Sequence, residues 1–140
     1  MGMVLWANLL KDGDVLGDQN DLVALSKHFG RLDKISKGLG YGPLSAMFDQ
    51  TDLEVNMEVR EMPEHYASTT EFMRDSGTWV ALDAAIGQMQ ALRDHLEAEK
   101  PRIGLLFDAR EAVLEELDQS LGFARAHLGD GVKFNFAVVT

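Results

Sequence analysis

Residues 3–10 read MVLWANLL, and residues 132–139, near the other end of the chain, read VKFNFAVV. Both stretches are short and apolar and lie next to turn-forming Asp-Gly pairs or glycines, a combination typical of β-strands. Strands this apolar would be prone to aggregation at the exposed edge of a sheet. We therefore expect the two strands to lie side by side near the centre of one sheet.

A third strand is predicted over residues 53–60, LEVNMEVR. In an extended chain Leu53, Val55, Met57 and Val59 would fall on one side and the polar residues between them on the other. A period of two is typical of a strand with one buried and one solvated face. This stretch therefore predicts a strand with one face in the core and the other in water.

Helices are predicted where apolar residues recur at helical spacing. The predicted segments are residues 20–37, 44–48, 79–99 and a last helix from about 108 to 128. Asp18 or Asn20 is expected to cap the first of them, because a short side chain with an oxygen accepts hydrogen bonds from free amides. The predicted fold class is α+β, in a single globular domain over residues 1–140. It has a small, mostly antiparallel sheet (strands near 3–10, 53–60 and 132–139) and three to four helices packed on one face.

The chain has 140 residues, a formal net charge of −10 and no cysteine. The absence of cysteine excludes disulfides and thiolate metal sites and fits a reducing compartment. The net charge disfavours nucleic acid and acidic membrane surfaces, which both attract clustered Lys and Arg. The apolar start lacks a basic flank, and no stretch approaches the ~20 apolar residues of a membrane helix. We expect a cytoplasmic protein.

No catalytic, metal or cofactor motif is found. The stretch DGDVLGD at residues 12–18 begins like a calcium loop, but Leu16 and Val23 stand where oxygen ligands are needed. The four histidines lack metal-ligand spacing, and neither a nucleophile elbow nor a phosphate-binding loop is present. We therefore predict no metal, no cofactor and no catalytic residue.

One charge pattern carries more information. Residues 49–64 hold six acids and a single base, Arg60. A solvated face explains such a run, and a docking surface for a basic protein is the sharper hypothesis, since complementary charge speeds encounter and excludes wrong partners. The candidate partner-binding residues are Asp49, Asp52, Glu54, Glu58, Glu61 and Glu64.

The leading hypothesis is a small acidic protein–protein interaction module, such as an inhibitor or immunity-type binder of a basic partner. The alternative is a small-molecule-binding domain or minor enzyme with a pocket near His65 and Tyr66, since a loop histidine beside an acid is a candidate general base. A structural subunit of a larger assembly is a third possibility. Phe123 lies opposite the apolar stripe of the last helix, which leaves both a monomer and a homodimer open.

Overall fold

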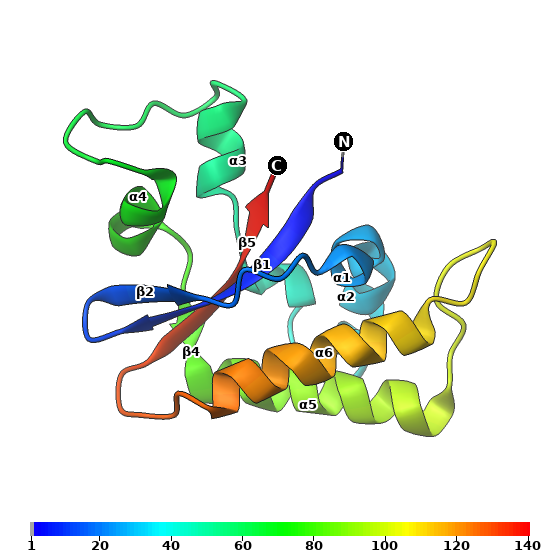
Figure 1. The fold of residues 1–140 in the computed structure, drawn as a ribbon. Helices are drawn as coiled ribbons and strands as arrows, with labels where there is room; N and C mark the ends of the chain where they lie inside the picture. The colour runs from blue at the N-terminus through cyan, green and yellow to red at the C-terminus, as the bar shows by residue number, and fades with distance from the viewer. Residues whose placement is uncertain (1) are drawn as a thin grey trace.

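The computed structural model describes residues 2–140 and contains one mostly antiparallel sheet (Figure 1). Its strands are β1 (Val4–Lys11), β2 (Asp14–Gly17), β3 (Phe48–Asp49), β4 (Val80–Ala81) and β5 (Lys133–Val139). The strand order is β2-β1-β5-β3, and β4 also pairs with β5. The first and last strands are therefore adjacent and central, as predicted.

The helices are α1 (Val23–Lys27), α2 (Phe29–Gly38), α3 (Thr51–Asn56), α4 (Thr69–Ser76), α5 (Leu82–Glu99) and α6 (Arg110–Arg125). A short 3-10 helix, η1, spans Leu44–Met47. The α+β class is confirmed, with somewhat more helices than predicted. No helix within residues 2–140 has the length and apolar character needed to cross a lipid bilayer.

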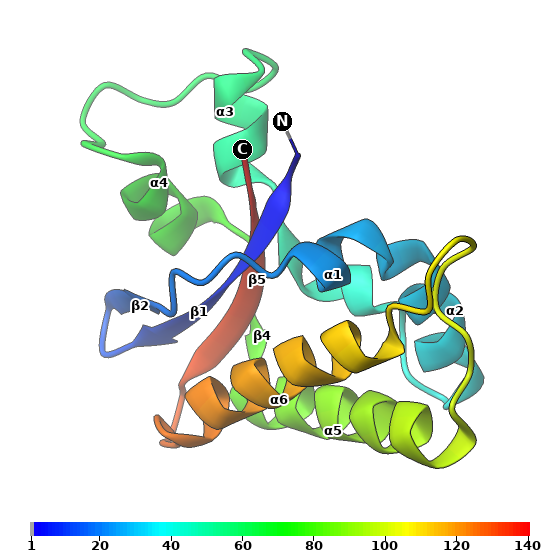
Figure 2. The same ribbon diagram turned by 45° about the vertical axis from the view of Figure 1, so that its right-hand side comes forward.

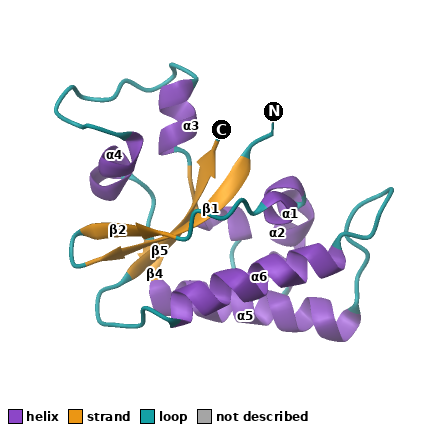
Figure 3. Cartoon of the chain, viewed as in Figure 1, coloured by secondary structure: helices purple, strands orange, loops and turns teal. Residues whose placement is uncertain are grey.

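The sheet divides these helices into two groups (Figures 1 and 3). Its inner face packs on α1, α2, α5 and α6 and forms the core with them. On this face Leu5, Ala7 and Leu9 of β1 lie opposite Val138, Phe136 and Phe134 of β5, and all six side chains are buried. The outer face carries Trp6, Asn8, Asn135 and Ala137, and α3 and α4 flank it.

The strand predicted over residues 53–60 is wrong. Residues 51–56 form α3, Met57 and Val59 are exposed, and the chain reverses at Glu58, whose φ is 58°. The chain leaves β3 at Asp49, whose carboxylate accepts a hydrogen bond from the Thr51 backbone N–H, and it continues from there as α3. Of the alternating residues, only Leu53 packs its side chain against the core.

The first predicted helix is broken at His28 into α1 and α2, and neither Asp18 nor Asn20 caps it. The acceptor at its start comes from α6 instead. The Glu116 carboxylate accepts hydrogen bonds from the backbone N–H groups of Ala24 (3.0 Å) and Leu25 (2.8 Å). Both amides lie in the first turn of α1, where helical partners are missing. Glu116 thus joins α1 to α6 across the core.

Replacing Glu116 with Gln tests this long-range cap. A glutamine offers one oxygen to two amides and carries no charge, so we expect Glu116→Gln to lower the free energy of unfolding by about 1 to 2 kcal/mol. Urea denaturation measures the change. Glu115→Gln, at the exposed neighbouring position on the same helix, is the matched control. Equal stability of the two variants would contradict the assigned role of Glu116.

Candidate functional site

The outer face of the sheet bears a cavity of about 540 Å³ between the central strands and the α3–α4 pair. Strands β1 and β5 supply its floor, and residues of α3 and α4 supply one wall. We call it the outer-face cavity. It is lined by Gly2, Val4, Trp6, Asn8, Asp21, Asp52, Asn56, Thr69, Thr70, Met73, Ala137, Val139 and Thr140.

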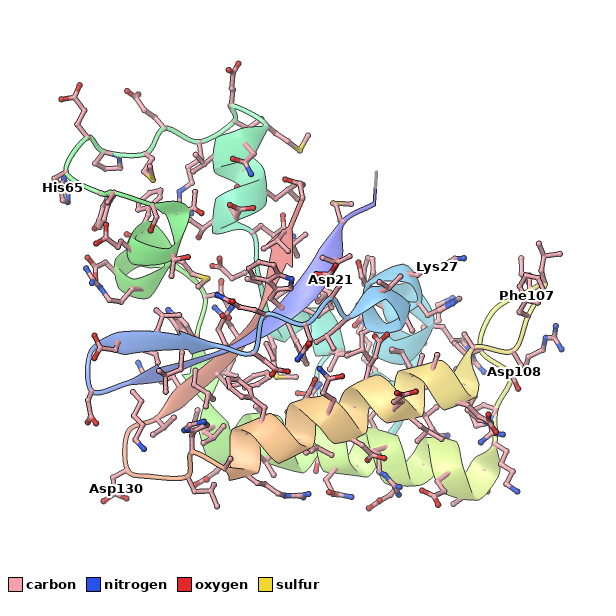
Figure 4. All side chains as sticks on the ribbon, viewed as in Figure 1. Asp21, Lys27, His65, Phe107, Asp108 and Asp130 are labelled. Carbon is pink, nitrogen blue, oxygen red and sulfur yellow. The ribbon has the colours of Figure 1, made fainter. Side chains whose placement is uncertain are left out.

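Trp6 and Asp21 form one side of the outer-face cavity. Trp6 points outward because its neighbours on β1, Leu5 and Ala7, are buried on the inner face. Its indole N–H donates a hydrogen bond of 2.7 Å to Oδ1 of Asp21, which lies in the segment between β2 and α1 (Figure 4). The indole therefore fixes the position of an exposed carboxylate.

Asp52 lies in the first turn of α3, on the wall of the cavity. Its Oδ1 accepts a 2.7 Å hydrogen bond from the Thr69 hydroxyl, and its Oδ2 accepts one of 3.1 Å from the Asn56 amide. The same amide donates to the Thr140 hydroxyl at 3.2 Å. These contacts join α3, α4 and the end of β5, so this second carboxylate also has a fixed position.

The floor of the cavity contains a buried amide pair. Asn8 and Asn135 lie opposite each other on the two central strands. Asn8 donates to Oδ1 of Asn135 at 3.2 Å, and Asn135 donates to the Thr78 carbonyl at 2.9 Å. Such satisfied amides add no charge. Two carboxylates and no Lys, Arg or His lie among the described residues that line the cavity, so its formal charge is negative.

The acidic stretch at residues 49–64, here called the acidic arm, is divided by the structure. The arm comprises β3's Asp49, α3 and the following loop, which stands away from the sheet beyond the cavity (Figure 1). Asp52 lines the cavity, and Glu54 pairs with Arg60 at 3.8 Å. The remaining acids of the loop, Glu58, Glu61 and Glu64, are exposed. The exposed acids of the arm therefore lie outside the lining of the cavity.

Asp49 differs from the other acids of the arm because it is buried. Its carboxylate accepts hydrogen bonds from the backbone N–H groups of Thr51 (3.0 Å) and Thr78 (2.8 Å) and from the Thr51 hydroxyl (3.1 Å). Gly77 approaches it so closely that an added Cβ would lie 2.6 Å from Oδ1. Asp49 therefore holds the start of α3 against the segment that leads into β4, and it presents no surface to a partner.

Substitution of Asp49 tests this structural role. In Asp49→Asn a single amide oxygen would face two backbone N–H groups, so we expect a loss of about 2 kcal/mol in the free energy of unfolding. Chemical denaturation gives the value. Glu61→Gln removes an equal charge at an exposed position of the same arm and should leave stability within about 0.5 kcal/mol of the native chain. A stable Asp49→Asn protein would show that the carboxylate is dispensable.

His65 and Tyr66 lie in the loop before α4, at the far side of the arm from the sheet (Figure 4). His65 is exposed and its ring lies 4.1 Å from that of Tyr66, which also packs against Phe72. The Tyr66 hydroxyl donates to Asp75 at 3.0 Å. None of the five cavities described here is lined by His65 or Tyr66. The pocket proposed near these residues has no counterpart among them.

The contact between Tyr66 and Asp75 shifts the pKa values of both side chains. Partial burial, together with the acceptor and negative charge of Asp75, raises the pKa of Tyr66. Hydrogen bonds from Arg74 and Tyr66 lower the pKa of Asp75. Because the pKa of Tyr66 is raised in the folded state, its hydrogen bond stabilises the fold fully at pH values below the ordinary pKa of tyrosine. This stabilisation is lost as the pH rises through the raised pKa. These residues thus form a structural clasp around α4.

An alkaline titration checks this clasp. In a Tyr41→Phe background, where Tyr66 is the remaining tyrosine, Asp75→Asn should move the pKa of Tyr66 down toward the ordinary value near ~10. Removal of the negative charge and of the carboxylate acceptor is the reason. Tyrosinate ultraviolet absorbance reports the titration. An unchanged midpoint would mean that Asp75 has no influence on the phenol.

Within residues 2–140, no three His, Asp or Glu side chains gather as a metal ion would require. The segment at residues 12–18 forms the β1–β2 turn and contains the whole of β2. Comparison with known proteins found no match among protein-family models, curated proteins or solved structures. The function is therefore argued from the site itself.

Sequence reasoning identified one lining residue, Asp52, and missed Trp6, Asp21 and the threonine and asparagine that orient Asp52. A signal for Trp6 was present, because the alternation of β1 places residues 6 and 8 on the face opposite Leu5 and Ala7. No local sequence pattern indicates Asp21, because only the folded chain brings it beside Trp6 at the cavity.

Proposed function

We propose that this protein is a binding module that holds a cationic segment of a basic partner protein in the outer-face cavity. One observation carries the proposal: among residues 2–140, the lining of the cavity combines two positioned carboxylates and an indole with no Lys, Arg or His. A cavity of this composition is complementary to a guanidinium or ammonium group.

The geometry favours such a group in three respects. A cation that meets the Trp6 ring gains about 0.5 to 2 kcal/mol from the negative face of the indole. Asp21 and Asp52 are already held by Trp6 and Thr69, so little side-chain freedom is lost on binding. A carboxylate oxygen can accept more than one hydrogen bond, so both acids can still accept hydrogen bonds from a ligand.

The acidic arm supports the same proposal at longer range. Glu58, Glu61 and Glu64 are exposed on the arm that continues from the wall of the cavity, and they add to the negative field there. A field of this kind raises the rate of encounter with a basic protein and is weakened by salt.

The narrower form of the proposal is an inhibitor or immunity-type protein that neutralises a basic toxin or nuclease. We propose a cytoplasmic location for it, supported by a composition without cysteine. Either a monomer or a homodimer fits this role, and Phe123 is half-buried against the core and His127.

The experiment uses an arginine-rich peptide and its citrulline counterpart of the same length. Citrulline keeps the shape of arginine without its charge, so we expect the first peptide alone to bind. Trp6 is the reporter in a Trp79→Phe background, because these are the two tryptophans of the chain. A change in Trp6 fluorescence that saturates with the arginine peptide would place the cation at the cavity.

Two charge-matched variants separate the cavity from a general acidic surface. Asp21→Asn with Asp52→Asn removes both carboxylates of the cavity and should weaken peptide binding about tenfold or more. Asp12→Asn with Asp14→Asn removes the same charge from the exposed β1–β2 turn and should weaken it about twofold or less. Equal losses in the two variants would contradict the proposed site and leave only non-specific attraction.

A further inference from the structure

The loop between α5 and α6 carries the most exposed apolar side chains among residues 2–140. Leu105, Leu106 and Phe107 are 96%, 86% and 80% exposed. We call these three consecutive residues the apolar tip. The loop projects from the body of the molecule at the end opposite the acidic arm in both ribbon views (Figures 1 and 2). Three adjacent exposed apolar side chains at a projecting point indicate an interaction surface.

Hydrogen bonds and packing fix the loop that carries the tip. Arg102 donates to the carbonyls of Gly104 (3.2 Å) and Leu105 (2.9 Å), and Ile103 is fully buried. Oδ1 of Asp108 accepts from the backbone N–H groups of Ile103 (3.0 Å) and Arg110 (3.1 Å). Several specific contacts therefore hold the tip in a position that is exposed to solvent.

Gly104 adds a backbone constraint at the base of the tip. Its φ is 98°, in the left-handed region that favours glycine, and an added Cβ would lie 2.7 Å from the Phe107 carbonyl oxygen. The chain can turn this sharply only because no side chain is present. The turn directs Leu105, Leu106 and Phe107 away from the core.

The surroundings of the tip on the side of α1 and α2 are basic. Two hollows of about 490 and 370 Å³ lie between the loop and these helices. Their described lining residues include no carboxylate. The basic and imidazole side chains that line them are Lys27, His28, Arg31 and Arg102. Figure 4 shows Lys27 on the side of the molecule that carries Phe107. On the side of α5 and α6, by contrast, Lys100 and Arg110 lie among glutamates.

We propose that the apolar tip inserts into the headgroup region of an anionic lipid bilayer, where Lys27, Arg31 and Arg102 contact acidic headgroups. Apolar side chains backed by Lys and Arg are the composition of interfacial membrane anchors. Each base near an anionic surface strengthens binding about fivefold. The net charge of the whole chain predicts repulsion, but the described residues that line the two hollows on the side of α1 and α2 include bases and no carboxylate, and this side of the tip would face the lipid.

The shape of the tip favours a bilayer over a protein groove. A projecting point of three consecutive residues presents no stripe or strand edge for a partner segment to follow, whereas a bilayer needs no complementary pocket. The acidic arm lies at the opposite end of the molecule. Its repulsion from the membrane is screened beyond a Debye length of about 8 Å at physiological ionic strength.

Vesicle co-sedimentation of the 140-residue chain tests the proposal. We expect binding to vesicles of phosphatidylcholine with phosphatidylserine, and much weaker binding to phosphatidylcholine alone. Leu106→Ser with Phe107→Ser should reduce the partition coefficient about tenfold or more. Lys27→Gln with Arg31→Gln should reduce it by about fivefold for each base, on the phosphatidylserine vesicles only.

A matched variant distinguishes the tip from exposed apolar surface in general. Met57→Ser with Val59→Ser removes side chains that are 62% and 69% exposed on the acidic arm, and it should partition as the native chain does. All substituted positions are exposed, so thermal unfolding should be unchanged and a loss of binding cannot be a loss of fold.

Three results would overturn the proposal. The first is no binding to phosphatidylserine vesicles, and the second is an equal loss of binding in the tip and arm variants. The third is a change of sedimentation coefficient in the tip variant without vesicles, which would assign the tip to contact with a second copy of the chain. None of these outcomes bears on the outer-face cavity, whose peptide test is independent.

Discussion

The antiparallel pairing of β1 with β5 determines both the core and the cavity. The register runs from Val4 opposite Val139 to Leu10 opposite Lys133. Because side chains alternate between the faces of a sheet, this register gathers leucines and phenylalanines on the inner face and leaves tryptophan and asparagine on the outer one. A slip of one residue would place Asn8 opposite a phenylalanine, and one strand would then turn its apolar side chains away from the core. The position of Trp6 over the cavity therefore follows from the same constraint that packs the protein.

The sequence predicts the elements whose pattern is long and regular. The two central strands, α5 and α6 were all expected near their observed positions. Residues 53–60 were misassigned because alternation describes the side chains and carries no information about the helix start at Thr51, whose backbone N–H donates to the buried Asp49 carboxylate. The strands β3 and β4, which pair with β5, have two residues each and are too short for any periodic signal. The break at His28 and the cap from Glu116 likewise depend on contacts made in the folded chain.

The candidate site was predictable in its charge and not in its geometry. Counting acids finds the arm at residues 49–64, but it treats Asp49 and Asp52 alike, and the fold buries one and places the other in a cavity. Asp21 and Asp52 are far apart in the sequence and meet the same cavity because α3 packs beside the end of β5. The net charge likewise gives no information about where charges lie, because it sums the acidic arm and the basic hollows beside the apolar tip.

The two proposed surfaces rest on different parts of the fold. The outer-face cavity belongs to the sheet and to α3 and α4, whereas the apolar tip is held by α1, α2, α5 and α6. The acidic arm and the loop that carries the tip project on opposite sides of the molecule, so a bilayer at the tip leaves the arm in solution (Figures 1 and 2). A basic partner is itself drawn to an anionic membrane surface. A module bound to lipid at its tip would therefore present its acidic arm where such a partner accumulates.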